Sequence, residues 1–399
     1  MSLVEIAKSI YETALLIEQQ AQDDGVAKPL QQTHLLHYMT QGPLSALRTL
    51  GWTHLDTIGL ELIIRHKIQH KVPSEGSITY QSLAEQCSVP LPLLKRVLRQ
   101  TMTNFIFAED SSGNVTHSVF SRFMRDNAYI QCQFQANMDE SWRASTRVVD
   151  AISDPVTVEE TIKSAWGLEN NATMPLFQEL EANHPERAEK FAHLMTFYAG
   201  MAKAEPTVKN YDWKSLPDGA KIVDVGGGKG SLSISLAEEF SKHNFVVQDL
   251  PETVAEGEKA VLPESVKGRV TFQAHNFFEP QPQRDADVYF FRAVFHNWTD
   301  KDCVRILLGL VPALRKGAKI LIQDPYLPEP GTVGAWKNRD LLAASLRMMI
   351  FFNSYDRNED EWKALLKRAD TRFRLSLFKR PDEQPVASNM CFVEITWDG

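Results

Sequence analysis

The chain has 399 residues, of which 43% are hydrophobic and 24% charged, and its net charge at pH 7 is −8. Because an ordinary domain holds roughly 100 to 200 residues, this length predicts two or three domains. The composition is typical of a folded globular protein and excludes disordered, collagen-like and disulfide-scaffold chains. The acidic balance argues against a protein that tracks nucleic-acid phosphates, and it identifies no partner by itself.

Cysteine usage and the apolar segments predict a protein of a reducing compartment. The four cysteines lie far apart and form no Cys-x-x-Cys pair, so neither a disulfide framework nor a thiolate zinc site is indicated, and we expect no metal. Residues 1–5 carry an acid where a secretory signal needs basic residues, and the apolar run 348–352 is too short to span a membrane. We therefore expect a cytoplasmic protein with no membrane segment.

The N-terminal third shows the element order of a winged helix-turn-helix. A short strand and a helix are expected over 77–85, followed by a second helix over 91–103 with apolar residues such as Leu93 pointing inward. A hairpin is expected over 105–117, with its turn at 110–114. Such a domain either binds DNA or serves as a structural or dimerising unit.

The second helix of this motif argues against the DNA-binding alternative. It carries three basic residues, Lys95, Arg96 and Arg99, but few side chains of the kind that read base edges. Three charges on one helix usually form a solvated face. We therefore favour the structural or dimerising interpretation and expect no nucleic-acid partner.

The second half of the chain predicts an α/β domain. Residues 126–210 are helical by pattern, and from Lys221 short β-branched runs alternate with amphipathic helices. Alternation of this kind predicts a parallel sheet with helices on both faces. The last two runs have no helix between them and predict an antiparallel hairpin at one end of the sheet. The expected strands are 221–225, 245–248, 270–273, 288–291, 319–323, 372–378 and 390–396.

The strongest local signal is the sequence Val-Asp-Val-Gly-Gly-Gly-Lys-Gly at 223–230, where a predicted strand enters a glycine cluster and an amphipathic helix follows. Glycines let the backbone turn sharply and approach a ligand closely. A phosphate-binding Walker loop is excluded because Lys229 is followed by Gly230 instead of Ser or Thr. A dinucleotide fingerprint is disfavoured because Ser231 stands where its third glycine should be.

Two acidic residues accompany this loop. Asp249 ends the second predicted strand, at a separation from the glycines where a carboxylate can bind both hydroxyls of a ribose. Asp224 adds negative charge beside the loop, which favours an ammonium group and disfavours a phosphate. The structural alternatives are a helix N-cap for Asp249 and a solvated strand end for Asp224. Taken with the loop, the pair predicts a cationic ligand that carries a ribose.

Four sequence runs together resemble the class I S-adenosylmethionine-dependent O-methyltransferases of the plant caffeate and flavonoid type, in particular their fungal secondary-metabolite branch. The runs are 223–230, Gln-Asp-Leu-Pro at 248–251, Phe-Arg-Ala-Val-Phe-His-Asn-Trp-Thr-Asp at 291–300, and Leu-Pro at 327–328. The resemblance covers nearly the whole chain. It implies a Rossmann-like sheet of seven strands, S-adenosyl-L-methionine as cofactor, a small-molecule substrate and a homodimer.

The resemblance also implies a domain division. A winged-helix dimerisation domain would occupy 1–125, and a helical connector that contributes to the substrate pocket would occupy 126–201. The Rossmann-like catalytic domain that binds the cofactor would occupy 202–399.

The residues that would contact the cofactor follow from the same resemblance. They are Asp224, Gly226, Gly228, Asp249, Leu250, Asn276, Phe277 and Arg292. The two glycines would line the methionine portion, Asp249 the ribose, and Asn276 with Phe277 the adenine. The family usually has Asp at position 276, so an amide would make the adenine contact here.

The candidate general base is His296, which follows the fourth predicted strand at the sheet edge where ligands of open α/β folds bind. Its ordinary pKa of about 6.5 keeps an imidazole mostly neutral at pH 7, so it can accept a phenol proton. In the family two glutamates orient this base, and the matching residues here are the shorter Asp324 and Asp356. Asn297 replaces a family Asp. The structural alternative is that His296 caps the helix that starts at Thr299.

The substrate pocket is expected to draw on apolar and aromatic side chains that could equally be plain core. They are Met195, Tyr198, Met348 and Phe352, with Phe134 as a further candidate. His117 lies where some pericyclases of the same branch face their substrate, although a histidine is also ordinary there.

Three functions follow from these observations. We favour an O-methyltransferase that acts on a hydroxylated aromatic or polyketide-type molecule. The alternative is a cofactor-dependent pericyclase, because such enzymes share this fold but lack the base constellation, and both supporting acids are shortened here. A non-catalytic DNA-binding or scaffold protein is the third hypothesis, which predicts salt-dependent binding to duplex DNA.

Overall fold

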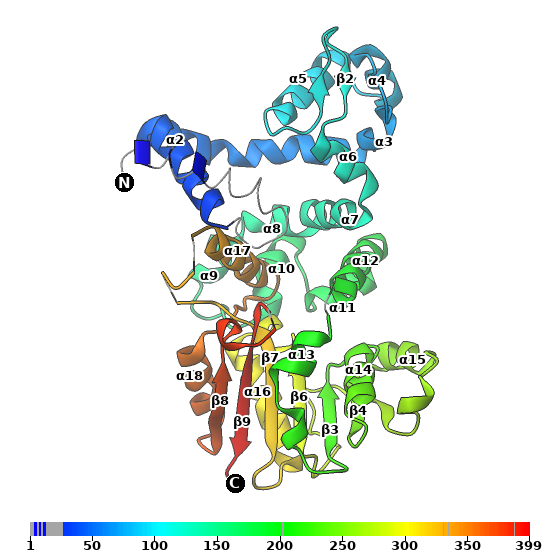
Figure 1. Ribbon diagram of the computed structural model, residues 1–399, viewed down its shortest axis with the longest axis vertical. Helices are drawn as coiled ribbons and strands as arrows, with labels where there is room; N and C mark the ends of the chain where they lie inside the picture. Colours follow the sequence, from blue (N-terminus) through cyan, green and yellow to red (C-terminus); the bar gives the residue numbers. More distant parts are fainter. Residues whose placement is uncertain are drawn as a thin grey trace. The chain divides into compact units, whose positions relative to one another are not determined.

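The computed structural model describes residues 4, 5, 8, 11, 12, 27–201, 203–329, 331–333, 335–386 and 388–399. Its contacts divide the chain into two compact units (Figure 1). The first comprises Met1–Arg143, Leu180–Ala199 and Gly334–Arg339, and the second comprises Ala144–Glu179, Gly200–Val333 and Asp340–Gly399. The helical segment 126–201 is thus shared between the two units.

The first unit begins with the long helix α2 and continues through a helix-turn-helix and a small hairpin. The bounds are α2 (Ala27–Arg65), α3 (Ile68–Lys71), α4 (Tyr80–Cys87), α5 (Leu91–Met102), β1 (Ala108–Glu109), β2 (Val115–Thr116), α6 (Val119–Asp126), α7 (Ala128–Ala136), the π-helix η1 (Asn137–Trp142) and most of α12 (Pro185–Met201). α2 is kinked at Gly42, which has φ 70° and precedes Pro43. The elements follow in the predicted order.

Two details of that prediction are wrong. The first hairpin strand does not start at Phe105, because Phe105 and Phe107 have φ of 61° and 64°, and a left-handed backbone cannot join a ladder. The strand begins at Ala108 instead. Leu93 is exposed, whereas Leu94 and Leu98 of the same helix are buried in the core of the unit.

The second unit contains a seven-stranded mixed sheet with strand order β5-β4-β3-β6-β7-β9-β8 (Figure 1). The five strands from β3 to β7 are parallel, β9 is antiparallel to β7, and β8 is antiparallel to β9. The sheet and its terminal hairpin are therefore as predicted. The bounds are β3 (Lys221–Val225), β4 (Asn244–Asp249), β5 (Val270–Ala274), β6 (Val288–Arg292), β7 (Lys319–Pro325), β8 (Phe373–Lys379) and β9 (Met390–Trp397).

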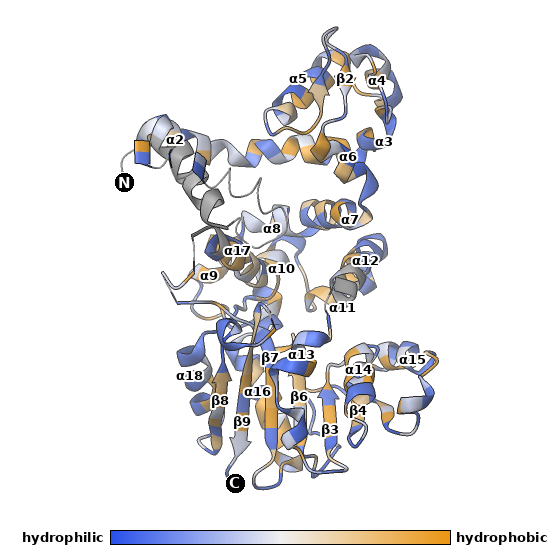
Figure 2. Ribbon diagram, in the orientation of Figure 1, coloured by the Kyte–Doolittle hydropathy of each residue, from blue (hydrophilic) through white to orange (hydrophobic). Residues whose placement is uncertain are grey.

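Helices cover both faces of this sheet because successive strand residues point to opposite sides. Ile222 and Phe290 belong to one buried cluster, which includes Leu236 of α14. Their neighbours in the strands belong to a second cluster, which includes Trp362 of α18. α18 is drawn mostly in hydrophilic colours, whereas the strands contain many hydrophobic residues (Figure 2). The main helices that flank the sheet are α13 (Glu205–Asn210), α14 (Ser231–Glu239), α15 (Pro251–Glu258), α16 (Asp300–Leu310) and α18 (Glu359–Ala369).

Further helices precede the first strand of the sheet in the sequence, and α17 lies between β7 and β8. They are α8 (Arg143–Ser145), α9 (Val148–Ser153), α10 (Ala165–Asn170), α11 (Leu176–Asn183) and α17 (Ala335–Phe352), whose last turns carry residues of the candidate site. Within the described part of the chain, we find no helix with the length and apolar character needed to cross a membrane.

Candidate active site

The candidate site lies at the carboxyl ends of the parallel strands. The glycine loop follows β3, Asp249 ends β4, and the segment with Asn276 and Phe277 follows β5. His296 follows β6, and Asp324 lies near the end of β7. Because these strands are neighbours in the sheet, the predicted cofactor and base residues of this unit lie along one edge.

The glycine loop is held by the neighbouring strand and needs glycine for two different reasons. The N–H groups of Gly226 and Gly227 donate to the carbonyl of Gln248 at 2.8 and 3.0 Å. A Cβ on Gly226 would lie 2.9 Å from a methyl of Val294, so this position has no room for a side chain. Gly228 has φ 60° and nothing within 4 Å of its Cβ position. Its backbone therefore needs glycine, while the space beside it is open to a ligand.

Asp249 faces the same loop from β4. Its carboxylate accepts the N–H of Gly228 and the N–H of Leu250, both at 2.8 Å. The helix-cap alternative is wrong, because the N-cap of α15 is Leu250. Each carboxylate oxygen keeps a lone pair for a further donor, as two ribose hydroxyls would require. Leu250 is half exposed beside it.

Asp224 is buried beneath the loop. Its side chain accepts a hydrogen bond of 2.6 Å from Ser233, and a Cβ on Gly227 would lie 2.6 Å from one carboxylate oxygen. Burial raises the pKa of Asp224 to about 6, against the opposing effects of Ser233 and Arg292. The alternative of a solvated strand end is therefore wrong. The carboxylate of Asp224 thus lies against Gly227 of the loop, and its contact with the cofactor stays a prediction.

Arg292 supplies an unused hydrogen-bond donor at the end of β6. Its Nε is buried and has no hydrogen-bond partner among the described residues. Burial lowers the pKa of Arg292, and the charge of Asp224 opposes this shift. A buried donor without a partner is costly, so it fits a site that is completed by a polar ligand.

The segment after β5 carries the two predicted adenine contacts. Asn276 is exposed, and its side-chain oxygen accepts the N–H of Phe278 at 3.1 Å. Phe277 packs edge-on against Trp298 with ring centroids 5.8 Å apart. A Cβ on Gly226 would lie 3.9 Å from the Phe277 ring, so the glycine loop and this aromatic ring border one another. An apolar ring next to an exposed amide suits a flat heteroaromatic base.

His296 is held through its backbone on both sides. Its N–H donates to Asp324 Oδ2 at 3.0 Å, and its carbonyl accepts the hydroxyl of Ser354 at 2.6 Å. The other oxygen of Asp324 accepts the N–H of Val294 at 3.1 Å. The alternative of a helix cap is wrong, because Thr299 caps α16. Asp324 therefore fixes the loop that presents the imidazole through backbone N–H groups.

Asp356 is the acid that faces the imidazole. The distance from its Oδ1 to Nδ1 of His296 is 3.6 Å, which is longer than a hydrogen bond. The same Oδ1 is buried and has no hydrogen-bond partner in the described part of the chain. Burial lowers the pKa of His296, but the carboxylates of Asp356 and Asp324 outweigh it, and the pKa lies above its ordinary value.

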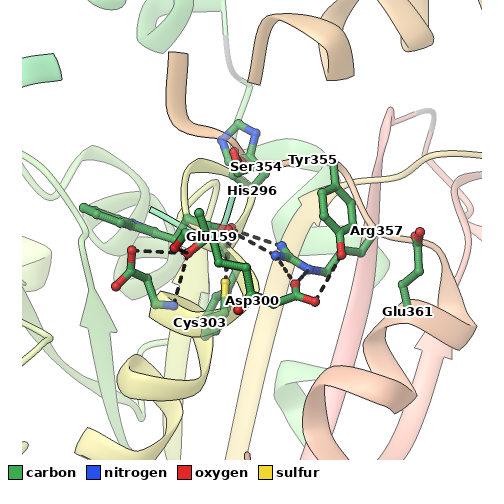
Figure 3. Close-up of polar contacts among 12 residues, drawn as sticks. Glu159, His296, Asp300, Cys303, Ser354, Tyr355, Arg357 and Glu361 are labelled. Carbon is green, nitrogen blue, oxygen red and sulfur yellow. Dashed lines mark hydrogen bonds and ion pairs between the residues drawn. The ribbon is translucent and has the colours of Figure 1, made fainter. Parts of the chain in front are cut away.

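Arg357 is a residue of this site that the sequence reasoning missed. Its guanidinium donates to the carbonyls of Phe295 and Trp298 at 3.2 and 3.1 Å and to Asp300 at 2.7 Å (Figure 3). It thereby clamps the loop on both sides of His296. The Arg357 side chain is 2% exposed, and a buried arginine needs several hydrogen-bond acceptors. The only hint of its role in the sequence is its position directly after Asp356.

The predicted substrate residues fall in both units. Met348 and Phe352 lie on α17 in the second unit, and Phe352 stacks on Phe177 with centroids 5.9 Å apart. Their contact with a substrate stays a prediction. Three further candidates belong to the first unit: Met195, Tyr198 and Phe134. Of these, Tyr198 packs edge-on against Tyr129, and Phe134 borders the apolar core.

His117 also belongs to the first unit, where it is buried. Its Nδ1 lies 2.9 Å from the hydroxyl of Ser121, and its Nε2 lies 3.2 Å from the carbonyl of Val72. Burial lowers its pKa. Because both ring nitrogens have partners within the unit, the geometry supports an ordinary core histidine, and contact with a substrate stays a prediction.

No group of three or more His, Cys, Asp or Glu side chains within the described ranges could hold a metal ion. The residues at the sheet edge instead suit an organic cation with a ribose and a flat base, as deduced above.

A seven-stranded sheet with an antiparallel last strand, a glycine loop after its first strand and an acid after its second define the S-adenosylmethionine-dependent methyltransferase class of α/β folds. Comparison with known proteins gives the particular family. The family model described as "O-methyltransferase domain" matches residues 151–372. The chain belongs to this family of S-adenosyl-L-methionine-dependent O-methyltransferases.

Relatives and solved structures agree with this assignment. The chain is 36% identical over 344 residues to the "Grayanic acid biosynthesis cluster O-methyltransferase" of Cladonia grayi, covering 85% of this chain and 71% of the relative. It resembles the structure of OxaC in complex with sinefungin and meleagrin, with a TM-score of 0.78, 19% identity and coverage of 99% and 98%. It also resembles a structure described as "A Pericyclic Reaction enzyme", with a TM-score of 0.70, 20% identity and coverage of 98% and 100%. At identities of 20% and 19%, these two structures support the assignment of the fold alone.

Proposed function

We propose that this enzyme transfers the methyl group of S-adenosyl-L-methionine to a hydroxyl of an aromatic or polyketide-type secondary metabolite, with His296 as general base. The observation that carries the proposal is the imidazole itself, which is fixed through its backbone and has a carboxylate opposite Nδ1. A proton on Nδ1 facing Asp356 leaves Nε2 as the acceptor. Nε2 then takes the proton of the substrate hydroxyl.

The cofactor is proposed to lie across the sheet edge. Its methionine portion would lie at Gly226 and Gly228, where the Gly228 backbone borders open space. Its ribose would lie at Asp249 beside Leu250, and its adenine at Asn276 and Phe277. Arg292 and Asp224 would complete the polar surroundings. The cofactor would supply an electrophilic methyl group, and the protein would bind and align the substrate and accept its proton.

The protein's main task in this reaction is alignment. The substrate oxygen has to approach the methyl carbon in line with the leaving sulfur, and such positioning contributes several kcal/mol. His296 would orient the substrate hydroxyl by accepting a hydrogen bond from it and would then take its proton. Asp324, Ser354 and Arg357 keep the His296 loop in place. Met348 and Phe352 on α17, in the same unit as His296, are proposed to contact the substrate.

One observation favours the pericyclase alternative. In that case the protein would bind S-adenosyl-L-methionine without consuming it and would steer a cyclisation with polar side chains. The 3.6 Å between Asp356 and His296 means that the shortened acid makes no hydrogen bond to the candidate base. A weakly supported base matters less to a cyclisation than to proton abstraction.

The remaining proposals concern assembly and location. We propose a winged-helix dimerisation domain at 1–125, within the first unit. A helical connector would occupy 126–201, and the catalytic domain would occupy 202–399. Large exposed apolar side chains on α2, among them Leu44, Leu47 and Trp52, suit a homodimer contact. A cytoplasmic location remains our expectation.

The experiment that tests the function uses His296→Ala and wild type, incubated with methyl-labelled cofactor and a panel of hydroxylated aromatic compounds. Label in the product of the wild type, with loss of turnover in the variant, supports methyl transfer. An isomerised product of unchanged mass with unconsumed cofactor would favour the pericyclase.

A further inference from the structure

Four glutamines form a ring of hydrogen bonds beside the cofactor edge of the sheet, which the backbone N–H of Gln283 completes. The Nε2 group of Gln248 donates to Gln273 and to Gln281, both at 2.8 Å. Gln281 donates back to Gln248 Oε1 at 2.8 Å, and Gln283 donates to Gln273 at 2.8 Å. The N–H of Gln283 closes the ring on Gln281 Oε1 at 3.0 Å. Each donor of the Gln248 amide is thus used.

Gln248 connects two loops that are far apart in the sequence. Its backbone carbonyl accepts the N–H groups of Gly226 and Gly227, whereas its side chain forms a reciprocal amide pair with Gln281. Both glutamine side chains are buried. A buried reciprocal amide pair favours one geometry, because a shift would leave buried polar groups without partners.

The loop over 275–283 is tied at both ends, and in its middle the rings of Phe277 and Phe278 pack against Trp298. Its start is tied by the His275 N–H to the carbonyl of Asp249 at 2.9 Å, and its end by the Gln281 N–H to the carbonyl of Gly309 at 2.9 Å. At Gly309 a Cβ would lie 3.2 Å from the carbonyl oxygens of Phe277 and Glu279, so α16 packs closely against the loop. At the end of the loop opposite to Asp249, the backbone of Gln281 binds α16, and its side chain adds the link to Gln248 and so to the strand that holds the glycine loop.

We propose that the Gln248–Gln281 pair is a positioning device for the cofactor, which keeps the loop with Asn276 and Phe277 at a fixed separation from the glycine loop. Gln248 then sets the distance between the glycine loop, where the methionine end of the cofactor is proposed to bind, and the loop with Asn276 and Phe277, where its adenine is proposed to bind. This inference rests on the proposed placement of the adenine at Asn276 and Phe277.

The test compares Gln248→Met and Gln281→Met with wild type. Each variant removes one half of the amide pair at similar volume and retains the carbonyl that holds the glycine loop. The control is Gln384→Met, which removes side-chain bonds to Asn210 and to the Met390 carbonyl in the same unit. The measurements are the Kd of S-adenosylhomocysteine by calorimetry and hydrogen exchange of peptides over 275–283 and 226–230.

The expected result is a Kd about tenfold higher in either variant and no further increase in the double variant, as for two halves of one interaction. Exchange should speed up over 275–283 and stay unchanged over 226–230. Gln384→Met should keep the Kd of wild type. If Gln248→Met and Gln281→Met lower the melting temperature but leave the Kd and the loop exchange unchanged, the ring is ordinary core and the inference is overturned.

A further variant separates this inference from the proposed adenine placement. If Asn276→Ala weakens binding of S-adenosylhomocysteine while Gln248→Met and Gln281→Met do not, the positioning role alone is overturned. If Asn276→Ala and Phe277→Ala both leave the Kd unchanged, the adenine lies elsewhere, and the inference falls with the placement on which it rests.

Discussion

The carboxylate of Asp356 lies 3.6 Å from Nδ1 of His296, and no other described residue satisfies the nearer carboxylate oxygen. A pair at this distance is electrostatically coupled but not hydrogen-bonded. The second acid, Asp324, binds the backbone N–H groups of Val294 and His296. Both aspartates therefore favour the charged imidazole, and Asp324 in addition fixes the position of its loop.

Replacing the base should abolish most turnover without affecting the cofactor. In His296→Ala we expect kcat for methyl transfer to fall by about 10²- to 10⁴-fold, the usual contribution of a general base. The Kd of S-adenosylhomocysteine, measured by calorimetry, should stay within about twofold of wild type, because every proposed cofactor contact is retained. A variant with nearly full activity would show that His296 is not the base.

Lengthening the acid should help a methyltransferase. Asp356→Glu adds one carbon-carbon bond of about 1.5 Å, enough to close the 3.6 Å separation to hydrogen-bond length. We therefore expect a several-fold increase in kcat. Asp356→Asn, which keeps the size and removes the charge, is the matched control and should lower kcat. If both changes leave kcat unaltered, the acid does not support the base.

The pH profile should report the coupling between His296 and the acids. The pKa of His296 is raised, so the imidazole gains its proton at a higher pH than usual, and turnover should fall on the acidic side through this raised pKa. In Asp356→Asn the acidic limb should move to lower pH. The stability of the fold should depend on pH in the opposite direction to turnover. The attraction between the charged His296 and the acids stabilises the fold fully below the ordinary histidine pKa, and this contribution is lost as the pH rises through the raised pKa of the folded state. An acidic limb that does not move would contradict the assignment.

Removing the clamp on the base loop should separate turnover from cofactor binding. Arg357→Met deletes the donors to Phe295, Trp298 and Asp300 and leaves Asp300 with the hydroxyl of Tyr355 alone. The loss should destabilise the fold, because the two backbone carbonyls lose a buried donor, although the side chain of Asp300 is 25% exposed and retains contact with water. We expect a lower melting temperature, and a lower kcat at temperatures where the variant remains folded, with the Kd of S-adenosylhomocysteine nearly unchanged. Arg357→Lys should restore part of the loss, because it keeps the charge.

Much of the catalytic fold could be predicted from the sequence. The strand over 221–225 was located without error, and the other strands differ by one or two residues, because β-branched runs between turn residues are a local signal. The hairpin near Phe105 was misplaced, because two left-handed residues interrupt an apolar run that otherwise looks like a strand.

The partners of the site residues could not be predicted. Asp249 was correctly placed beside the glycine loop, since strand ends meet at one sheet edge. The backbone role of Asp324, the clamp by Arg357 and the amide pair of Gln248 depend on side-chain directions in segments that are distant in the sequence. Such contacts carry no local pattern and appear only once the elements are packed.

The most direct test of the account is a single-turnover experiment with methyl-labelled S-adenosyl-L-methionine bound to wild type and to His296→Ala, using a hydroxylated aromatic compound that the wild type accepts. We predict that the wild type places one label on the product oxygen for each S-adenosylhomocysteine formed, and that the variant does so at least about a hundredfold more slowly. A cyclised isomer without label and with unconsumed cofactor, or an equal rate in the variant, would contradict the account.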